Sequence, residues 1–359
     1  MKKILILCPY PQNAAAGQRF KYEQYISSWK NNGYSVEVSS FFNKKTWDIL
    51  YEESNIFNKA IGTIRGYLLR LKYLFLLRQY DVVYIFMWVT PLGTSLFERL
   101  VRKLSKNIVY DFDDSVFLKE EVPKSMNLSL SGVANKSLYL ISSADRVILS
   151  SPYNLEFCVD TNVNSQAVYI PCSINTERFK KREEAPKDHK IVIGWTGTFS
   201  SIPYIDSIKD ALIELYQENP FKLLLITNFN YSFPEVDLEV VRWDVESEIE
   251  QLQRIDIGIY PVTLDQWTLG KGGLKVIQYM SIGIPSVATN HGTACDIIEN
   301  GVNGFLVDSQ QEWIESLKKL MDDLELRKII GNSARMHAEA NYSLKSVESK
   351  YLKVLDSLK

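Results

Sequence analysis

A glycine-rich segment, Gly270-Lys271-Gly272-Gly273, stands directly before a stretch of helical period that carries Lys275 and Gln278. The first amides of a helix have no partner inside it, and together with the helix dipole they attract anions such as phosphates. Lys271 adds a positive charge beside that helix end, and Lys275 and Gln278, three residues apart, share one helix face. We therefore predict a phosphate site here, with a pair of surface lysines on a glycine-rich turn as the alternative. The segment does not have the Walker pattern.

Two other loops that follow expected strands compete for a similar role. Residues 14–19 include Gly17 and Arg19, and residues 194–201 include Gly197 and Thr198. Small residues let the backbone approach a ligand, and amides and hydroxyls can cradle a phosphate. Neither loop contains Gly-x-Gly-x-x-Gly, so neither is a dinucleotide fingerprint, and each can also be read as an ordinary strand–helix connection.

Three carboxylates lie within four residues at Asp111-Phe112-Asp113-Asp114. Like charges this close repel one another, so they need a metal ion, a cationic neighbour or water. The segment supports three interpretations: a role in an active-site cleft, capping of the following helix, or coordination of a divalent ion. The spacing alone does not choose between them.

Short apolar runs rich in β-branched residues alternate with stretches of helical period along the whole chain, for example at residues 3–8, 82–89, 222–226 and 255–260. Continuous apolar strands between helices are typical of parallel sheets that helices cover on both faces. The alternation occurs on both sides of a charged interruption at residues 175–190, which we interpret as an interdomain linker. The predicted fold class is therefore α/β, with two doubly wound domains.

Composition narrows the class of protein. The chain has 359 residues, of which 46% are hydrophobic and 23% charged, and its net charge of −2 argues against a globally basic nucleic-acid binder. Residues 1–110 hold 16 basic and 7 acidic side chains, whereas the remainder holds 25 basic and 36 acidic.

Four scattered cysteines and three histidines show no zinc-ligand spacing, which favours reduced cytosolic thiols. The apolar run at residues 4–8 is too short for a signal peptide, and no run is long enough to span a membrane.

Several segments of the second half resemble family 4 glycosyltransferases of the GT-B fold. The likeness is specific across residues 168–342 and looser before them. It is carried by Lys275–Met280, Gly283–Thr289, Gly292, Ile298–Val307, Tyr169–Phe179 and Asp145–Ser151.

The resemblance implies two Rossmann-like domains that face each other across a cleft. Residues 1–172, joined by a returning terminal helix at 343–359, would form the acceptor-side domain, and residues 173–342 would bind the donor. A family member of this kind moves a sugar from a nucleotide-diphosphate-sugar to a glycan, retains the anomeric configuration and uses neither a metal nor another cofactor. The pattern is similar to a subgroup that assembles surface polysaccharides. A nucleotide-sugar epimerase of the same fold and a non-catalytic sugar-nucleotide-binding adaptor remain alternatives.

The chain departs from the family at two positions. Most relatives carry two glutamates separated by seven residues where this sequence has Gly270 and Gln278. Gln278 can still bond a ribose hydroxyl, because its amide both donates and accepts, whereas Gly270 has no side chain to offer the sugar. The 194–201 loop also lacks the Arg and Lys that many relatives aim at the diphosphate, and Lys271 is the expected substitute.

The expected site therefore has two sides. Lys271 and Asp113 are the expected catalytic residues, the lysine stabilising the leaving diphosphate and the aspartate orienting the acceptor hydroxyl. The other expected donor-binding residues are Gly197, Thr198, Gly272, Gly273, Lys275 and Gln278. The other expected acceptor-side residues are Gly17, Arg19, Asp111 and Asp114.

Residues 54–80 contain no Asp or Glu, but they contain five cations among many large apolar residues: Lys59, Arg65, Arg70, Lys72 and Arg78. Cations near an anionic leaflet each add to membrane affinity, so this segment predicts peripheral, salt-sensitive binding to an anionic membrane and fits a lipid-linked acceptor. The alternative is a buried domain helix with solvated cations. The expected location is the cytoplasm, at the inner face of the cytoplasmic membrane, with no nucleic-acid partner.

Overall fold

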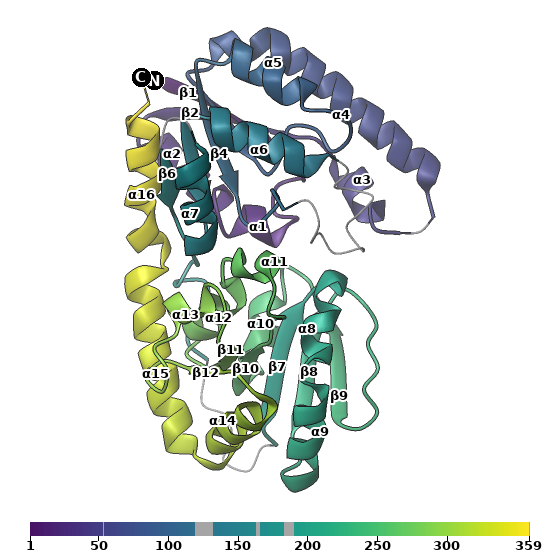
Figure 1. The fold of residues 1–359 in the computed structure, drawn as a ribbon, viewed down its shortest axis with the longest axis vertical. Helices are drawn as coiled ribbons and strands as arrows, with labels where there is room; N and C mark the ends of the chain where they lie inside the picture. Colours follow the sequence, from purple (N-terminus) through teal and green to yellow (C-terminus); the bar gives the residue numbers. More distant parts are fainter. Residues whose placement is uncertain (53, 119–131, 163–165, 183–189, 359) are drawn as a thin grey trace. The chain divides into compact units, whose positions relative to one another are not determined.

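The computed structural model describes residues 1–52, 54–118, 132–162, 166–182 and 190–358. The chain divides into two compact units, the first formed by Met1–Pro171 with Val347–Lys359 and the second by Cys172–Ser346 (Figure 1). Each unit is described by itself below.

The first unit is built on a six-stranded sheet in which all neighbouring strands run parallel. The order in the sheet is β2-β1-β3-β4-β5-β6. The central strands are buried along nearly their whole length, which is why they read as continuous apolar runs in the sequence. Their bounds are β1 Lys2–Cys8, β2 Tyr34–Ser40, β3 Val82–Phe86, β4 Asn107–Phe112, β5 Arg146–Leu149 and β6 Ala167–Tyr169.

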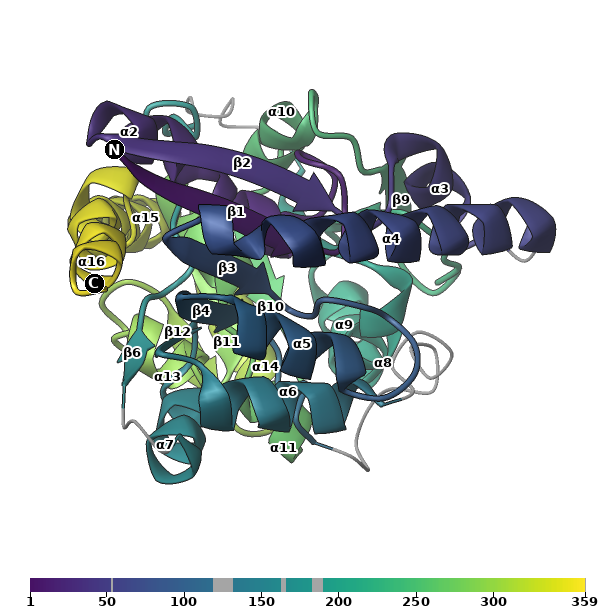
Figure 2. The same cartoon turned by 90° about the horizontal axis from the view of Figure 1, so that it is seen from above.

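Helices connect these strands, and Figure 2 shows α4 as a long helix whose end extends beyond the strands. The part of α16 that begins at Val347 belongs to this unit, where Tyr351 packs with ring centroids 4.8 Å from Tyr25 and 5.8 Å from Trp29. Lys2 Nζ donates to Leu358 O at 2.8 Å, so the two termini lie side by side. The helices are α1 Ala16–Arg19, η1 Glu23–Tyr25, α2 Ile26–Asn31, α3 Lys44–Ile49, α4 Ile56–Leu76, η2 Leu77–Gln79, α5 Leu96–Leu104, α6 Val133–Ser143, α7 Pro152–Thr161 and α16 Leu344–Asp356.

The second unit repeats this plan with a parallel sheet of order β12-β11-β10-β7-β8-β9. Its strands are β7 Val192–Gly197, β8 Lys222–Thr227, β9 Asp237–Arg242, β10 Ile257–Tyr260, β11 Ser286–Thr289 and β12 Phe305–Val307. Its helices are η4 Phe199–Ser201, α8 Ile202–Asp206, α9 Lys209–Glu218, α10 Glu248–Gln253, α11 Gln266–Leu269, α12 Leu274–Ser281, α13 Ala294–Ile297, α14 Gln310–Asp322 and α15 Leu324–Asn341.

Two parallel six-stranded sheets with helical connections confirm the predicted α/β class. Close packing fixes α12, the helix that follows the glycine-rich segment, on its sheet. A Cβ at Gly258 of β10 would overlap the ring of Tyr279, so the absence of a side chain at 258 allows α12 to lie directly against β10. Among the described helices, none has the length and hydropathy that crossing a membrane requires.

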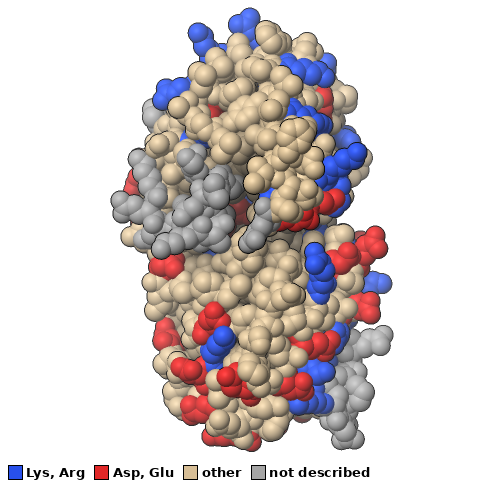
Figure 3. Space-filling model, turned by 90° about the vertical axis from the view of Figure 1, so that its right-hand side faces the viewer, with Lys and Arg blue, Asp and Glu red and all other residues tan. Residues whose placement is uncertain are grey.

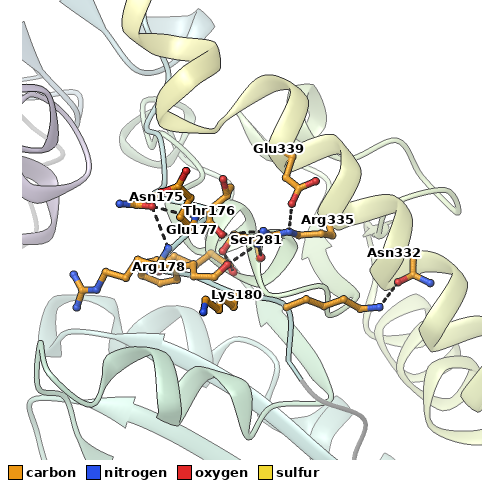
Figure 4. Close-up of polar contacts among 12 residues, drawn as sticks. Asn175, Thr176, Glu177, Arg178, Lys180, Ser281, Asn332, Arg335 and Glu339 are labelled. Atoms are coloured by element: carbon orange, nitrogen blue, oxygen red, sulfur yellow. Dashed lines mark hydrogen bonds and ion pairs between the residues drawn. The ribbon is translucent and has the colours of Figure 1, made fainter. Parts of the chain in front are cut away.

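The first part of the expected linker belongs to the second unit. Arg335 of α15 donates to the backbone oxygens of Thr176, Phe179 and Ser281 and pairs with Glu339 (Figure 4). Lys181 Nζ donates to Asn332 at 2.6 Å, and Arg182 pairs with the buried Asp256 at 2.9 Å. These contacts hold residues of the expected interdomain linker at Thr176, Phe179, Lys181 and Arg182 to the rest of the second unit. Residues 183–189 lie outside the described part of the chain.

Candidate functional site

The glycine-rich segment forms the turn between α11 and α12. Asp265 and Thr268 form a capping box that begins α11, and Gly270 caps its end. Gly273 has a φ of +65° and precedes the first residue of α12, and a Cβ at this position would also overlap Ile297. Only glycine meets both demands without strain. Helix α12 thus begins directly after the glycines, as predicted. Its first backbone amides have no partner within the helix and lie at the end of the turn.

The two lysines of this segment both lie over aromatic rings. Lys271 Nζ is 5.5 Å from the centroid of Tyr204, which belongs to α8. Lys275 Nζ is 5.6 Å from the centroid of Trp195 and 5.7 Å from that of Tyr260. A cation over a ring face is attracted by the ring quadrupole, so these rings favour the observed positions of the two ammonium groups.

Gly197 belongs to the same group of residues. A Cβ on Gly197 would overlap the ring of Trp195. The absence of a side chain at 197 therefore leaves room for the indole over which the ammonium group of Lys275 lies. The following loop is held by Thr198, whose Oγ1 lies 2.9 Å from Ser200 Oγ, and by Phe199, whose amide donates to Asn228 at 3.3 Å. The structure therefore brings Gly197 and Lys275 into one neighbourhood through Trp195, a residue that the sequence reasoning did not single out.

Gln278 lies on α12 with its side chain buried. Its Nε2 donates to Glu248 Oε1 at 3.4 Å, and Trp243 Nε1 donates to the same oxygen at 3.3 Å. Glu248 is itself buried and stands at the start of α10. Glu248 was not among the expected site residues, because nothing in its local sequence marks it as a partner of a residue thirty positions away. The ribose contact of Gln278 stays a prediction.

Asp111 is buried in the first unit and pairs with the equally buried Lys21, and it accepts from Tyr84 OH. Lys21 Nζ also donates to Phe112 O at 3.1 Å. Burial raises the pKa of the Asp111 carboxyl, and Lys21 opposes this shift. This position differs from the expected acceptor-side role, because a carboxylate enclosed by a lysine and a tyrosine stabilises the end of β4 instead of facing a ligand.

Asp113, in contrast, is partly exposed and lies against Gly17. A Cβ on Gly17 would overlap Asp113 Oδ2, so the aspartate occupies the space that a side chain at 17 would need. Asp114 N donates to Asp113 Oδ1 at 3.2 Å. Burial raises the pKa of Asp113 to about 6, with a further contribution from Asp114. The structure therefore brings three expected residues together here. Arg19 is nearly buried, with its guanidinium 5.0 Å from the centroid of Phe20.

Metal ligation was one interpretation of the aspartates. Within the described part of the chain, no group of three or more His, Cys, Asp or Glu side chains is placed to hold a metal ion. Independence from metal stays a prediction.

The comparisons with known proteins agree with this picture. Residues 242–337, which include the α11–α12 turn, match the family model described as glycosyl transferases group 1. D-inositol 3-phosphate glycosyltransferase of Paenarthrobacter aurescens is 37% identical over 70 residues, which are 19% of this chain. This match spans only 17% of the relative's own length.

Solved structures of similar fold cover the whole chain. The sucrose-phosphate synthase of Thermosynechococcus elongatus has a TM-score of 0.73 at 13% identity and covers 100% of this chain and 99% of its own. The Anabaena protein HepE, solved with UDP-glucose, has a TM-score of 0.67 at 16% identity and covers 100% of both chains. At these identities the likeness shows the fold, and with the family match it confirms the predicted resemblance to GT-B glycosyltransferases.

Proposed function

We propose that the protein is a glycosyltransferase that moves a sugar from a nucleotide-diphosphate-sugar to a glycan acceptor. The observation that carries the proposal is the α11–α12 turn: a helix start with two lysines held on aromatic rings, Lys271 on Tyr204 and Lys275 on Trp195 and Tyr260. This turn lies within the segment that matches the glycosyl transferase family model. Because HepE was solved with UDP-glucose, a uridine diphosphate sugar is the first donor to test.

The donor-side chemistry follows from the charge that the reaction creates. Breaking the bond between sugar and diphosphate leaves negative charge on the departing phosphate oxygen, and groups that stabilise this charge more in the transition state accelerate the step. Lys271, Lys275 and the amides at Gly272 and Gly273 are the groups in this chain that would do so. Gln278 would hold the ribose, with its amide oriented by Glu248.

On the acceptor side, Asp113 would orient the attacking hydroxyl. Its pKa of about 6 leaves the carboxylate mostly ionised at neutral pH, so that it accepts a hydrogen bond from the acceptor. The acceptor oxygen would bond to the anomeric carbon on the face from which the diphosphate leaves. The departing phosphate oxygen would take the hydroxyl proton, so that configuration is retained and no metal is needed. We further propose a lipid-linked acceptor, a role in surface polysaccharide synthesis, and a cytoplasmic location at the inner face of the membrane.

Release of nucleoside diphosphate, measured with and without an acceptor, tests the proposal. Acceptor-dependent release with an α-linked product from an α-linked donor, unchanged by EDTA, is the expected result. An epimerase would change the sugar without an acceptor, and an adaptor would bind the donor and release nothing. Lys271→Ala should lower turnover about 100-fold. Lys209→Ala is the matched control, because Lys209 also lies over aromatic rings, 5.0 Å from Tyr231 and 5.4 Å from Phe233.

A further inference from the structure

Helix α4 exposes a continuous row of large apolar side chains. Six of them, which we call the α4 seam, are between 43% and 86% exposed although each is a Phe, Ile or Leu. They recur in alternating steps of four and three residues, so they lie along one line of the helix over about 27 Å. Single exposed apolar residues are common on protein surfaces, but a row of this length marks an interaction site. The seam consists of Phe57, Ile61, Ile64, Leu68, Leu71 and Phe75.

The opposite side of α4 is fixed against the domain, and this determines the direction of the seam. Gly62, Gly66, Arg70 and Tyr73 are buried there. A Cβ at Gly66 would lie 2.6 Å from Phe41 Cζ, so the helix packs closely on that residue and cannot rotate to bury the seam.

Cations border the seam, but fewer than the sequence indicated. Arg70 is buried, and its guanidinium donates to Val89 O, Ser39 O and Cys8 O at 2.8 to 3.1 Å, so the expectation that it meets a membrane was wrong. Arg65 and Lys72 are exposed and, being seven residues apart, lie on one flank of the seam. On the face drawn in Figure 3, the first unit displays more Lys and Arg than Asp and Glu.

We propose that the α4 seam is the surface by which the protein docks on an anionic lipid membrane. The helix would lie in the plane of the interface, with the seam at the acyl boundary and the flanking Arg65 and Lys72 at the headgroups. The inference deepens the peripheral location in the proposed function and rests on it. A second copy of the chain fits this surface less well, because residues 54–80 hold no carboxylate that could pair with the cations of a partner helix.

The two contributions differ in size and in their response to salt. Each cation near an anionic leaflet strengthens binding about fivefold, and salt screens this effect. A fully inserted Leu or Phe contributes about tenfold or more, and salt does not screen it. The seam should therefore dominate, and binding should be weakened but not abolished at high salt.

Sedimentation with phosphatidylcholine vesicles, with and without phosphatidylglycerol, tests the proposal on the full chain. The wild type should bind the anionic vesicles much better than the neutral ones. Leu68→Gln with Phe75→Gln should lower binding at least tenfold, and Arg65→Gln with Lys72→Gln should remove most of the preference for anionic lipid. Because both seam residues are exposed, the variants should keep the wild-type midpoint of thermal unfolding.

Two matched controls separate the seam from apolar surface and charge in general. Ile329 and Met336 of α15 are exposed and also seven residues apart, and their Gln variants should bind like the wild type. Lys30→Gln with Lys353→Gln removes two exposed charges elsewhere in the first unit and should change little. Unaltered binding by the Leu68 and Phe75 variant would overturn the role of the seam.

Other outcomes distinguish this inference from the proposed function. If the wild type binds no vesicles but still transfers sugar to a soluble acceptor, the membrane inference fails and the glycosyltransferase stands. If the wild type is a dimer that Leu68→Gln with Phe75→Gln dissociates, and no vesicles are bound, the seam joins two copies of the chain and the proposal is overturned.

Discussion

Replacing Gly17 by alanine should impair sugar transfer through Asp113. The new Cβ would stand well inside the 3.0 Å that real Cβ atoms keep from their neighbours, and the atom that it meets is Asp113 Oδ2. The carboxylate must therefore move by about 1 Å, and a misplacement of that size can cost about 100-fold in rate. We expect the turnover number of Gly17→Ala to fall about 100-fold.

The fold should survive this change. Gly17 lies in the short helix α1 and does not have a positive φ, so an alanine fits its backbone. Alanine is favoured over glycine in a helix by about 1 kcal/mol, which offsets part of the strain from moving Asp113. The free energy of unfolding should thus change by less than about 1 kcal/mol while turnover falls.

A double-mutant cycle isolates the cause. Nucleoside diphosphate release is measured for Gly17→Ala, Asp113→Ala and the variant that carries both changes. If alanine at 17 acts by displacing the carboxylate, the double variant should be no slower than Asp113→Ala alone. Wild-type turnover in Gly17→Ala, or losses that simply multiply in the double variant, would refute the reasoning.

Three further changes test other parts of the structure. Because the pKa of Asp113 is raised to about 6, the turnover of the wild type should fall as the pH drops through 6. In Asp113→Asn, the pH profile of turnover should no longer show this fall. Because the folded pKa of Asp113 is raised, the stability that its carboxyl contributes is full below about pH 4 and is lost as the pH rises through 6. Urea unfolding at pH 8 should therefore find Asp113→Asn more stable than the wild type, by at most about 3 kcal/mol. In steady-state kinetics, Lys271→Ala should lose more turnover than Lys275→Ala, and the reverse would place the phosphate one helical turn further along α12. Lys21→Met should cost about 3–5 kcal/mol in urea unfolding, because it leaves the buried carboxyl of Asp111 without its counter-charge; a cost below 1 kcal/mol would contradict the ion pair.

The fold could be predicted from the sequence because its signals are local. Buried parallel strands read as uninterrupted apolar runs, and the turn before α12 needs glycine at Gly273 for reasons of backbone conformation and space. The resemblance to GT-B glycosyltransferases rests on the same kind of contiguous segment, which is why the family match to residues 242–337 includes the turn that the residues themselves had indicated.

The partners of the charged residues could not be predicted, since they are set by strand order. Lys275 meets Trp195 and Tyr260 because β7 and β10 are neighbours in the sheet although some sixty residues separate them in the chain. Lys21 meets Asp111 across ninety residues. The sequence indicated that the aspartates needed a metal ion, a cationic neighbour or water, but helical and strand periods carry no information about which residue would be that neighbour.

Two buried cations organise the carboxyl ends of the strands in the first unit. Arg70 binds carbonyls at the ends of β1 and β2 and just after β3, while Lys21 binds the end of β4. The carbonyls at such an edge are rich in negative partial charge, and buried cations balance it where water is excluded. Lys21 also affects Asp113, because it lowers the pKa of the Asp113 carboxyl, whereas burial and Asp114 raise that pKa. Without that lysine the carboxylate would titrate higher and spend more of its time protonated at neutral pH, unable to accept the hydrogen bond of an acceptor hydroxyl. Lys21, which faces no ligand itself, thus favours the charged form of Asp113 on which the proposed acceptor role depends, whereas the negative charge of Asp111 opposes it.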